Sequence, residues 1–269
     1  MKFAVLALVG AAGLAQVAVA QITAVNGIRQ ELRGFNQVPT STINATNSFP
    51  GIVEVAETMP ANETGEFAQN RHLSFLSTDN GVTSYELQNN ESFQISFDFR
   101  IGATVGRPSS NPGRIEGGIW FQNPRVGGDG NPFVDEGGVW VIDNGVSFVG
   151  GANQSFYLVG NNVYTVGQTI RMTYRYFAPG QTPESADGWA RYEVIYNGAS
   201  SGIREFDRNG TDANGFNNGT RISFRHQHTP SLLGEGTFST TYSNIQVVPA
   251  PASLALLGLA GTASRRRRG

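Results

Sequence analysis

The 269-residue sequence contains no cysteine. This absence excludes disulfide bonds, thiol catalysis, cysteine-ligated zinc ribbons and iron–sulfur chemistry. Outside the two ends, no window has the 3.6-residue apolar period of an amphipathic helix. A chain of this length can bury roughly 70% of the surface that it exposes when unfolded, so it needs no covalent cross-links. The absences therefore favour a non-helical domain that is stabilised by apolar burial.

Several segments instead alternate apolar and polar residues. Residues 93–101 place Phe93, Ile95, Phe97, Phe99 and Ile101 on one side. The same alternation occurs in four further segments, which are residues 169–177, 189–198, 221–227 and 241–248. Strict alternation predicts β-strands with one buried and one solvent-facing side.

The segments between these strands are rich in glycine, asparagine, proline and aspartate, and the chain has 34 glycines. Many short strands separated by such turns predict one all-β domain, an antiparallel β-sandwich or jelly roll, over residues 21–248. The strand spacing over residues 73–248 resembles the concanavalin-A-like, or laminin-G-like, jelly roll. A β-sandwich of another topology is the alternative.

A short motif occurs twice, as EGGIWFQN from Glu116 and as EGGVWVIDN from Glu136. If residues 124–135 form a loop, the two copies become neighbouring antiparallel strands. Trp120 and Trp140 then lie in the same phase of the pleat.

The N-terminus has the pattern of a secretory signal peptide. Lys2 precedes an apolar run that ends in Ala-Val-Ala, which predicts cleavage by signal peptidase between Ala20 and Gln21. The run is too short to be read first as a membrane span. We expect a signal helix over residues 1–20 and an exported protein.

The C-terminus combines Pro249 and Pro251 with a short apolar run over residues 253–264 and four arginines, Arg265, Arg266, Arg267 and Arg268. This layout resembles the PEP-CTERM sorting signal, which implies processing by an exosortase. Ala250 stands where that family has glutamate. A short apolar helix followed by arginines would anchor the tail in the inner membrane transiently. A flexible basic tail is the alternative, but it leaves the apolar run unexplained.

The charges are distributed unevenly along the chain. Five of the 19 basic residues, Lys2 and the four terminal arginines, lie in the two ends, so 14 basic residues remain against 21 acidic ones. An acidic domain argues against a nucleic-acid partner.

No pair of acids matches the requirement of a retaining glycoside hydrolase. Laminarinase-type hydrolases, which share the jelly roll, carry paired acids at even spacing on one strand, about 5–5.5 Å apart. Asp135 and Glu136 are adjacent and therefore point to opposite sides of a strand, while Glu116 and Asp143 are isolated. We therefore expect a protein that is not an enzyme.

Metal binding has two sets of candidates. His226 and His228 lie two apart on one side of a predicted strand, a spacing that a metal can use, although buried or exposed structural imidazoles are the more ordinary interpretation. An oxygen-rich loop with Asp129, Asn131, Asp135 and Glu136 is a candidate for Ca²⁺. Turn formation explains this loop equally directly, and no cofactor is required.

Carbohydrate binding has one set of candidates. Tryptophan rings stack on sugars while amides and acids bind the hydroxyl groups. The residues of these types are Trp120, Gln122, Trp140, Asp143 and Asn144. Alternatively, the tryptophans fill the core.

Together these patterns predict a non-enzymatic surface or matrix protein that binds extracellular polysaccharide. A purely structural envelope component and a glycan-active hydrolase are the alternatives.

Overall fold

The structure is a computed structural model. It describes residues 21–26, 29–30, 41–59, 70–88, 91–103, 114–123, 134–142, 147–151, 156–157, 164–206, 215–229 and 236–249. Both expected terminal helices, together with Ala20, Pro251 and the arginines from Arg265 to Arg268, lie outside these residues. In the described part of the chain, no helix is long and apolar enough to span a membrane.

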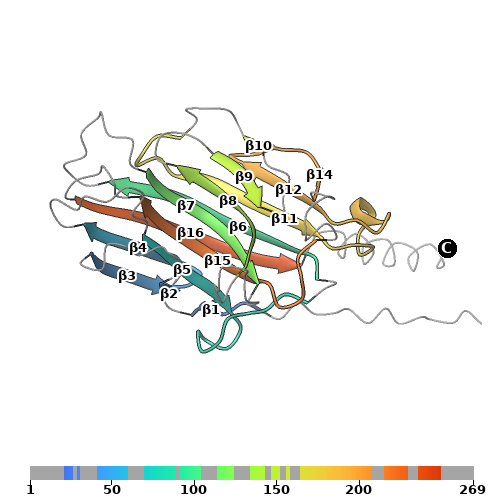
Figure 1. The fold of residues 1–269 in the computed structure, drawn as a ribbon, viewed down its shortest axis with the longest axis horizontal. Coiled ribbons are helices and arrows are strands. Elements are labelled where there is room, and N and C mark those ends of the chain that lie inside the picture. Colours follow the sequence, from blue (N-terminus) through green and yellow to red (C-terminus); the bar gives the residue numbers. More distant parts are fainter. Residues whose placement is uncertain are drawn as a thin grey trace, which may run out of the picture.

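The described residues form two antiparallel sheets of eight strands each, and the strand axes of the two sheets are nearly aligned (Figure 1). Sheet A contains, in spatial order, β1 (Ala24–Val25), β5 (Asn70–Ser77), β15 (Arg221–Thr229), β7 (Arg114–Asn123), β8 (Val134–Ile142), β9 (Ser147–Gly151) and β10 (Phe156–Tyr157), with β2 (Arg29–Gln30) also paired to β5.

Sheet B contains, in spatial order, β13 (Ala199–Ser200), β12 (Arg191–Tyr196), β11 (Ile170–Phe177), β6 (Phe93–Ala103), β16 (Gly236–Pro249), β4 (Ile52–Met59) and β3 (Thr42–Ser48), with β14 (Arg204–Glu205) also paired to β12. A single 3₁₀ turn at Pro183–Ser185 is the one helical element among the described residues. The predicted all-β jelly roll is confirmed.

The main core lies between the sheets and follows the predicted alternation. Every second residue of β6, from Phe93 to Ile101, is at most 1% exposed. These side chains meet the inward residues of sheet A, and the rings of Phe97 and Phe224 lie 5.5 Å apart. Each fully buried phenylalanine stabilises the fold by about 1.5–3 kcal/mol. The 3.3 Å rise and two-residue period of a strand therefore determine which residues build the core.

The duplicated motif forms the antiparallel pair β7 and β8, as predicted. The rings of Trp120 and Trp140 lie 4.8 Å apart on the side of sheet A that faces away from sheet B. Gly138 lies directly opposite Trp120. A Cβ atom there would lie 2.1 Å from Trp120 Cε3, so glycine leaves room for the indole.

Two expectations need correction. Residues 222–228 of β15 are all buried, so the prediction of one solvent-facing side is wrong for this strand. Its outward residue Arg225 packs on Trp120, and Gln227 is hydrogen-bonded to neighbouring strands. The last strand also continues one residue beyond Val248, since Pro249 pairs with Phe93 as the final residue of β16.

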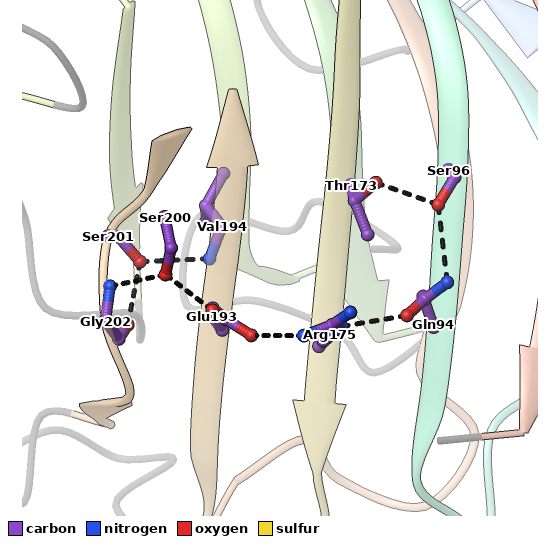
Figure 2. A network of polar contacts seen from close by, with 9 residues as sticks. All are labelled: Gln94, Ser96, Thr173, Arg175, Glu193, Val194, Ser200, Ser201 and Gly202. Carbon is purple, nitrogen blue, oxygen red and sulfur yellow. Dashed lines mark hydrogen bonds and ion pairs between the residues drawn. The ribbon is translucent and has the colours of Figure 1, made fainter. Parts of the chain in front are cut away.

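The outward side of sheet B has the expected polar character. Figure 2 shows a chain of contacts that leads from Ser200 of β13 to Glu193 of β12, Arg175 of β11 and Gln94 of β6. Arg175 donates to Glu193 Oε2 and to Gln94 Oε1, each at 2.8 Å. Its side chain is 32% exposed, so these contacts lie at the solvent boundary.

Candidate functional site

The outward side of sheet A, which we name face A, carries a buried polar cluster. Gln227 of β15 lies directly opposite Arg71 of β5 on one side and Glu116 of β7 on the other. Arg225 occupies the same face two residues earlier. Because cross-strand partners have Cβ atoms about 4.5–5.5 Å apart, the sheet register alone brings these four side chains together.

Hydrogen bonds connect the four side chains. The Nε of Arg71 donates to Gln227 Oε1 at 2.7 Å, and Arg225 donates to the same oxygen. A second bond from Arg225 reaches Glu116 Oε2 at 2.7 Å. The amide of Gln227 also donates to Glu116 Oε2, at 3.2 Å. The side-chain amide of Gln227 therefore holds the guanidinium groups of Arg71 and Arg225 side by side.

Both arginines stack on aromatic rings. The guanidinium carbon of Arg225 lies 4.4 Å from the ring centre of Trp120 and 5.6 Å from that of Trp140. Arg71 lies 5.4 Å from the centre of Trp120. Planar guanidinium groups stack well on indoles. This packing fixes the planes of both guanidinium groups.

A glycine allows this close packing. Gly118 lies between Arg225 and Trp140 in the sheet register. A Cβ atom at Gly118 would lie 2.1 Å from Val139 O, and its φ of +143° disfavours other residues. Face A is therefore shaped for side chains that lie flat over the sheet.

The described cluster combines two guanidinium groups with one carboxylate, that of Glu116. Arg225 and Glu116 have side chains only 3% and 10% exposed, so water screens them little. Guanidinium groups bind carboxylates in a bidentate manner.

The predicted carbohydrate residues are placed in part. Trp120, Trp140 and Gln122 all belong to face A, where the tryptophans form a second apolar cluster with Leu73, Phe75 and Ile142. The tryptophans are only 6% and 8% exposed. They thus support the arginines instead of presenting open ring faces. Asp143 and Asn144 lie outside the described residues.

The predicted calcium residues are largely outside the described part of the chain. Asp129 and Asn131 are not described, and Asp135 and Glu136 are described only as backbone positions of β8. In the described ranges, no group of three or more His, Cys, Asp or Glu side chains could hold a metal ion. The calcium site stays a prediction.

The histidines lie on the inward side of sheet A. His226 and His228 share that side, as predicted, and His72 of β5 joins them. Glu57 of β4 reaches across from sheet B, with its carboxylate 3.3 Å from His72 Nε2 and 3.4 Å from His226 Nε2. Glu57 also accepts a hydrogen bond of 2.6 Å from Asn70. Glu57, His72 and His226 are all fully buried.

Burial shifts the pKa of Glu57 and the pKa of His226 in opposite directions. Burial raises the pKa of the Glu57 carboxyl, but hydrogen bonds from His226 and His72 outweigh it and hold the pKa far below its usual value. Burial also lowers the pKa of His226, against the opposing influence of Glu57. The set therefore holds a carboxylate in the core directly behind the strands that carry Arg71 and Arg225.

Sequence reasoning did not identify Arg71, Arg225 or Gln227, and it treated Glu116 as an isolated acid. One signal was available. Arg225 and Gln227 alternate with Phe224 and His226, so they occupy the second side of a strand whose first side is apolar. The pairing of β15 with both β5 and β7, which joins segments about 110 to 150 residues apart in sequence, is not visible in any local pattern.

Comparison with protein-family models and with curated proteins finds no match. The fold is that of a jelly-roll β-sandwich like those of polysaccharide lyase family 7. Alginate lyase AlgAT5 of this family is 12% identical, with 77% of this chain and 81% of the other covered and a TM-score of 0.45.

Two further solved structures are similar. The endo-β-1,4-glucuronan lyase from the fungus Trichoderma reesei is 14% identical over 85% of this chain and 97% of its own, with a TM-score of 0.49. Alginate lyase PA1167 from Pseudomonas aeruginosa is 14% identical over 76% and 85%, with a TM-score of 0.44. At these identities the likeness concerns the fold.

The prediction of a non-enzymatic protein is wrong in the light of this comparison, because the similar solved structures are polysaccharide-cleaving enzymes. The prediction was based on the missing carboxylate pair of hydrolases. A lyase breaks a glycosidic bond by elimination and needs no such pair. The missing pair therefore excludes one chemistry and leaves another open.

Proposed function

We propose that this protein is a polysaccharide lyase that acts on a carboxylate-bearing glycan at face A. The observation that supports this proposal is the pair of buried arginines, Arg71 and Arg225, held side by side by Gln227 over Trp120. Guanidinium groups bind carboxylates in a bidentate manner, so a pair of them suits a glycan that carries uronate carboxylates. Polymers that the similar solved structures are named for, alginate and glucuronan, are of this chemical class.

Elimination needs a base beside a neutralised substrate carboxylate. Neutralisation by arginine makes the hydrogen on the adjacent carbon more acidic, and this hydrogen is then removed. Its electron pair forms a carbon–carbon double bond while the bond to the leaving glycosidic oxygen breaks. That oxygen takes up a proton from solvent. Glu116 is the one side chain in the described cluster that can accept the first proton.

Hydrolysis is less well supported by this geometry. A retaining mechanism requires two carboxyl groups about 5–5.5 Å apart. Within the described cluster of face A, Glu116 is the one carboxylate, and its hydrogen bonds from Arg225 and Gln227 hold it toward the cationic groups. Elimination needs only one base beside the arginines, and Glu116 has that position.

The decisive experiment measures the unsaturated sugar product by its ultraviolet absorbance. Polymannuronate, polyguluronate and polyglucuronate are offered as substrates, with dextran as the neutral control. We expect cleavage of one acidic polymer and none of dextran. Glu116→Gln should lower kcat by about 10²–10⁴-fold with little change in KM, as expected for loss of a general base.

Arg175→Gln provides the matched control, because Arg175 forms a similar ion pair on the opposite sheet. Its activity should equal that of the parent protein. Absence of product from all three acidic polymers would contradict the proposal. Reducing ends without unsaturated sugars would indicate hydrolysis instead.

We also propose that the two ends direct export and sorting, with signal peptidase and an exosortase as processing partners at the cell surface. The layout of residues 1–20 and of residues 249–269 supports this. Intact-mass measurement of protein from its native host tests it. A mature mass that begins at Gln21 and lacks Arg265 to Arg268 is expected, and a mass that retains Arg268 would contradict the sorting step.

A further inference from the structure

Strand β3 is an unusual edge. It pairs with β4 along its whole length, and no other strand of the described chain pairs with its second side. All seven residues are exposed. Among the described residues, the backbone N–H and C=O groups on that second side have no strand partner, and such an edge is a template for another strand.

The remaining sheet edges are protected by their length. The other terminal strands, β1, β2, β10, β13 and β14, have two residues each. Proteins protect edges with short strands, charged residues or proline. The β3 sequence TINATNS has seven residues, no charge and no proline. It has none of these protections.

We propose that β3 is the interface of a symmetric homodimer, in which a second copy of the chain adds its own β3 in antiparallel orientation and continues sheet B. The sequence of β3 fits itself when the two-fold axis passes through Ala45. Asn44 then lies opposite Thr46 of the second copy, and Thr42 lies opposite Ser48. Each such pair can donate and accept a hydrogen bond.

The charge distribution favours a second copy over a charged partner. The domain has an excess of acidic residues, so two copies repel each other where acids are exposed. Along β3 this repulsion is minimal, because Glu57 of the neighbouring strand is buried and Glu54 accepts a hydrogen bond from Thr241. A cationic or anionic partner would find no complementary charge on β3 itself.

Apolar contact adds to this pairing. Ile43 is 40% exposed and shares one side of β3 with Ala45. In the symmetric pair, each Ile43 lies diagonally beside Ala45 of the second copy, which is within reach of its side chain. One pair of strands buries less area than a standard interface, so we expect a dimer whose population depends on concentration.

Cross-linking tests the two-fold axis directly, because the chain has no cysteine of its own. Ala45→Cys places two cysteines opposite each other, with Cα atoms about 4.5–5.5 Å apart, a separation that suits a disulfide. Mild oxidation should produce a covalent dimer of this variant. Ile203→Cys is the control, because Ile203 is 49% exposed between β13 and β14, at the edge of sheet B opposite β3.

Sedimentation of the unlabelled protein over a roughly hundredfold concentration range gives the second test. The parent protein and Ile203→Lys should shift toward twice the monomer mass as concentration rises, whereas Thr46→Lys should stay monomeric at every concentration. Lysine is tolerated at strand edges, and circular dichroism confirms that the variants fold. A parent protein that remains monomeric, or equal cross-linking rates for Ala45→Cys and Ile203→Cys, would overturn the proposal.

Discussion

The outward sides of the two sheets carry the same kind of ion pair in different surroundings. On face A, Arg225 donates to Glu116 at 2.7 Å, and the two side chains are 3% and 10% exposed. On sheet B, Arg175 donates to Glu193 at 2.8 Å, with exposures of 32% and 11%. The bond lengths are nearly equal. Burial therefore decides how strongly each pair affects stability and what each can recognise.

The neighbours of each arginine explain the difference. Arg225 lies against Trp120, which removes water from its flat face. Arg175 has the polar Gln94 as its second partner, and Figure 2 shows this contact extending along the sheet as a chain of hydroxyl and amide groups. Low local dielectric strengthens an interaction and also raises the cost of breaking it. We therefore expect substitutions on the outward side of sheet B to lower stability less than substitutions on face A.

The largest expected effect comes from breaking the buried pair. Arg225→Ala leaves Glu116 buried without its ionic partner, which costs about 3–5 kcal/mol. The corresponding Arg175→Ala should cost about 1 kcal/mol or less, because water replaces the lost contact. Urea unfolding of both variants measures the contrast. Equal losses would show that burial is not the deciding factor.

Filling a glycine should have the next largest effect. Gly138→Ala forces Trp120 out of position, since the new Cβ would lie 2.1 Å from its ring, and overpacking typically costs about 1–3 kcal/mol. Gly102→Ala on sheet B meets only the Oγ of Ser239, at 2.7 Å, which can rotate away. Tryptophan fluorescence should shift for Gly138→Ala alone. A shift in both variants would contradict the placement of Trp120.

Acid should destabilise the part of the molecule behind face A. Because the folded-state pKa values of His226 and Glu57 lie below their unfolded values, the unfolded chain takes up protons first as the pH falls. Stability is then lost below about pH 6.5 for the histidine and below about 4.5 for the glutamate. His226→Gln should flatten the upper part of this curve. A curve identical to that of the parent protein would exclude His226 as its source.

The smallest effect is expected within the network of Figure 2. Ser96 and Thr173 share a hydrogen bond of 2.9 Å, and the buried Ser96 also accepts a hydrogen bond from Gln94. Thr173→Val keeps the shape and the β-branched side chain, so the free energy of unfolding should change by no more than about 0.5 kcal/mol. Thermal unfolding monitored by circular dichroism is sufficient to check this. A loss above about 1 kcal/mol would give sheet B the same sensitivity as face A.

The fold was largely predictable because alternation is a local property. Residues 93–101 alternate without interruption, and a strand with that pattern has only one way to bury its apolar side. The pairing of β7 with β8 was predictable for a similar reason, since the motif around Trp120 recurs around Trp140 at hairpin distance. The last strand was misjudged at both ends, because the alternating residues 241–248 are only part of β16, which spans Gly236–Pro249. Proline can end a ladder as well as lie beyond it.

The candidate site was only half predictable. Trp120, Trp140 and Gln122 were selected by residue type, and they do belong to face A. The arginines were not selected, because an arginine in an alternating strand is ordinarily a solvent-facing residue. Their significance arises from the register that places Gln227 between Arg71 and Glu116.

The sequence by itself determined the all-β class, the inward residues of strands with clear alternation such as β6 and β11, and the absence of cysteine chemistry, since these follow from composition and from a two-residue period. Tertiary structure alone decided which outward faces are buried. Strands far apart in the chain had to become neighbours before two arginines could share one amide, and before His72 and His226 could meet Glu57. Long-range pairing sets local dielectric and charge density, and these properties distinguish a binding face from a solvated one.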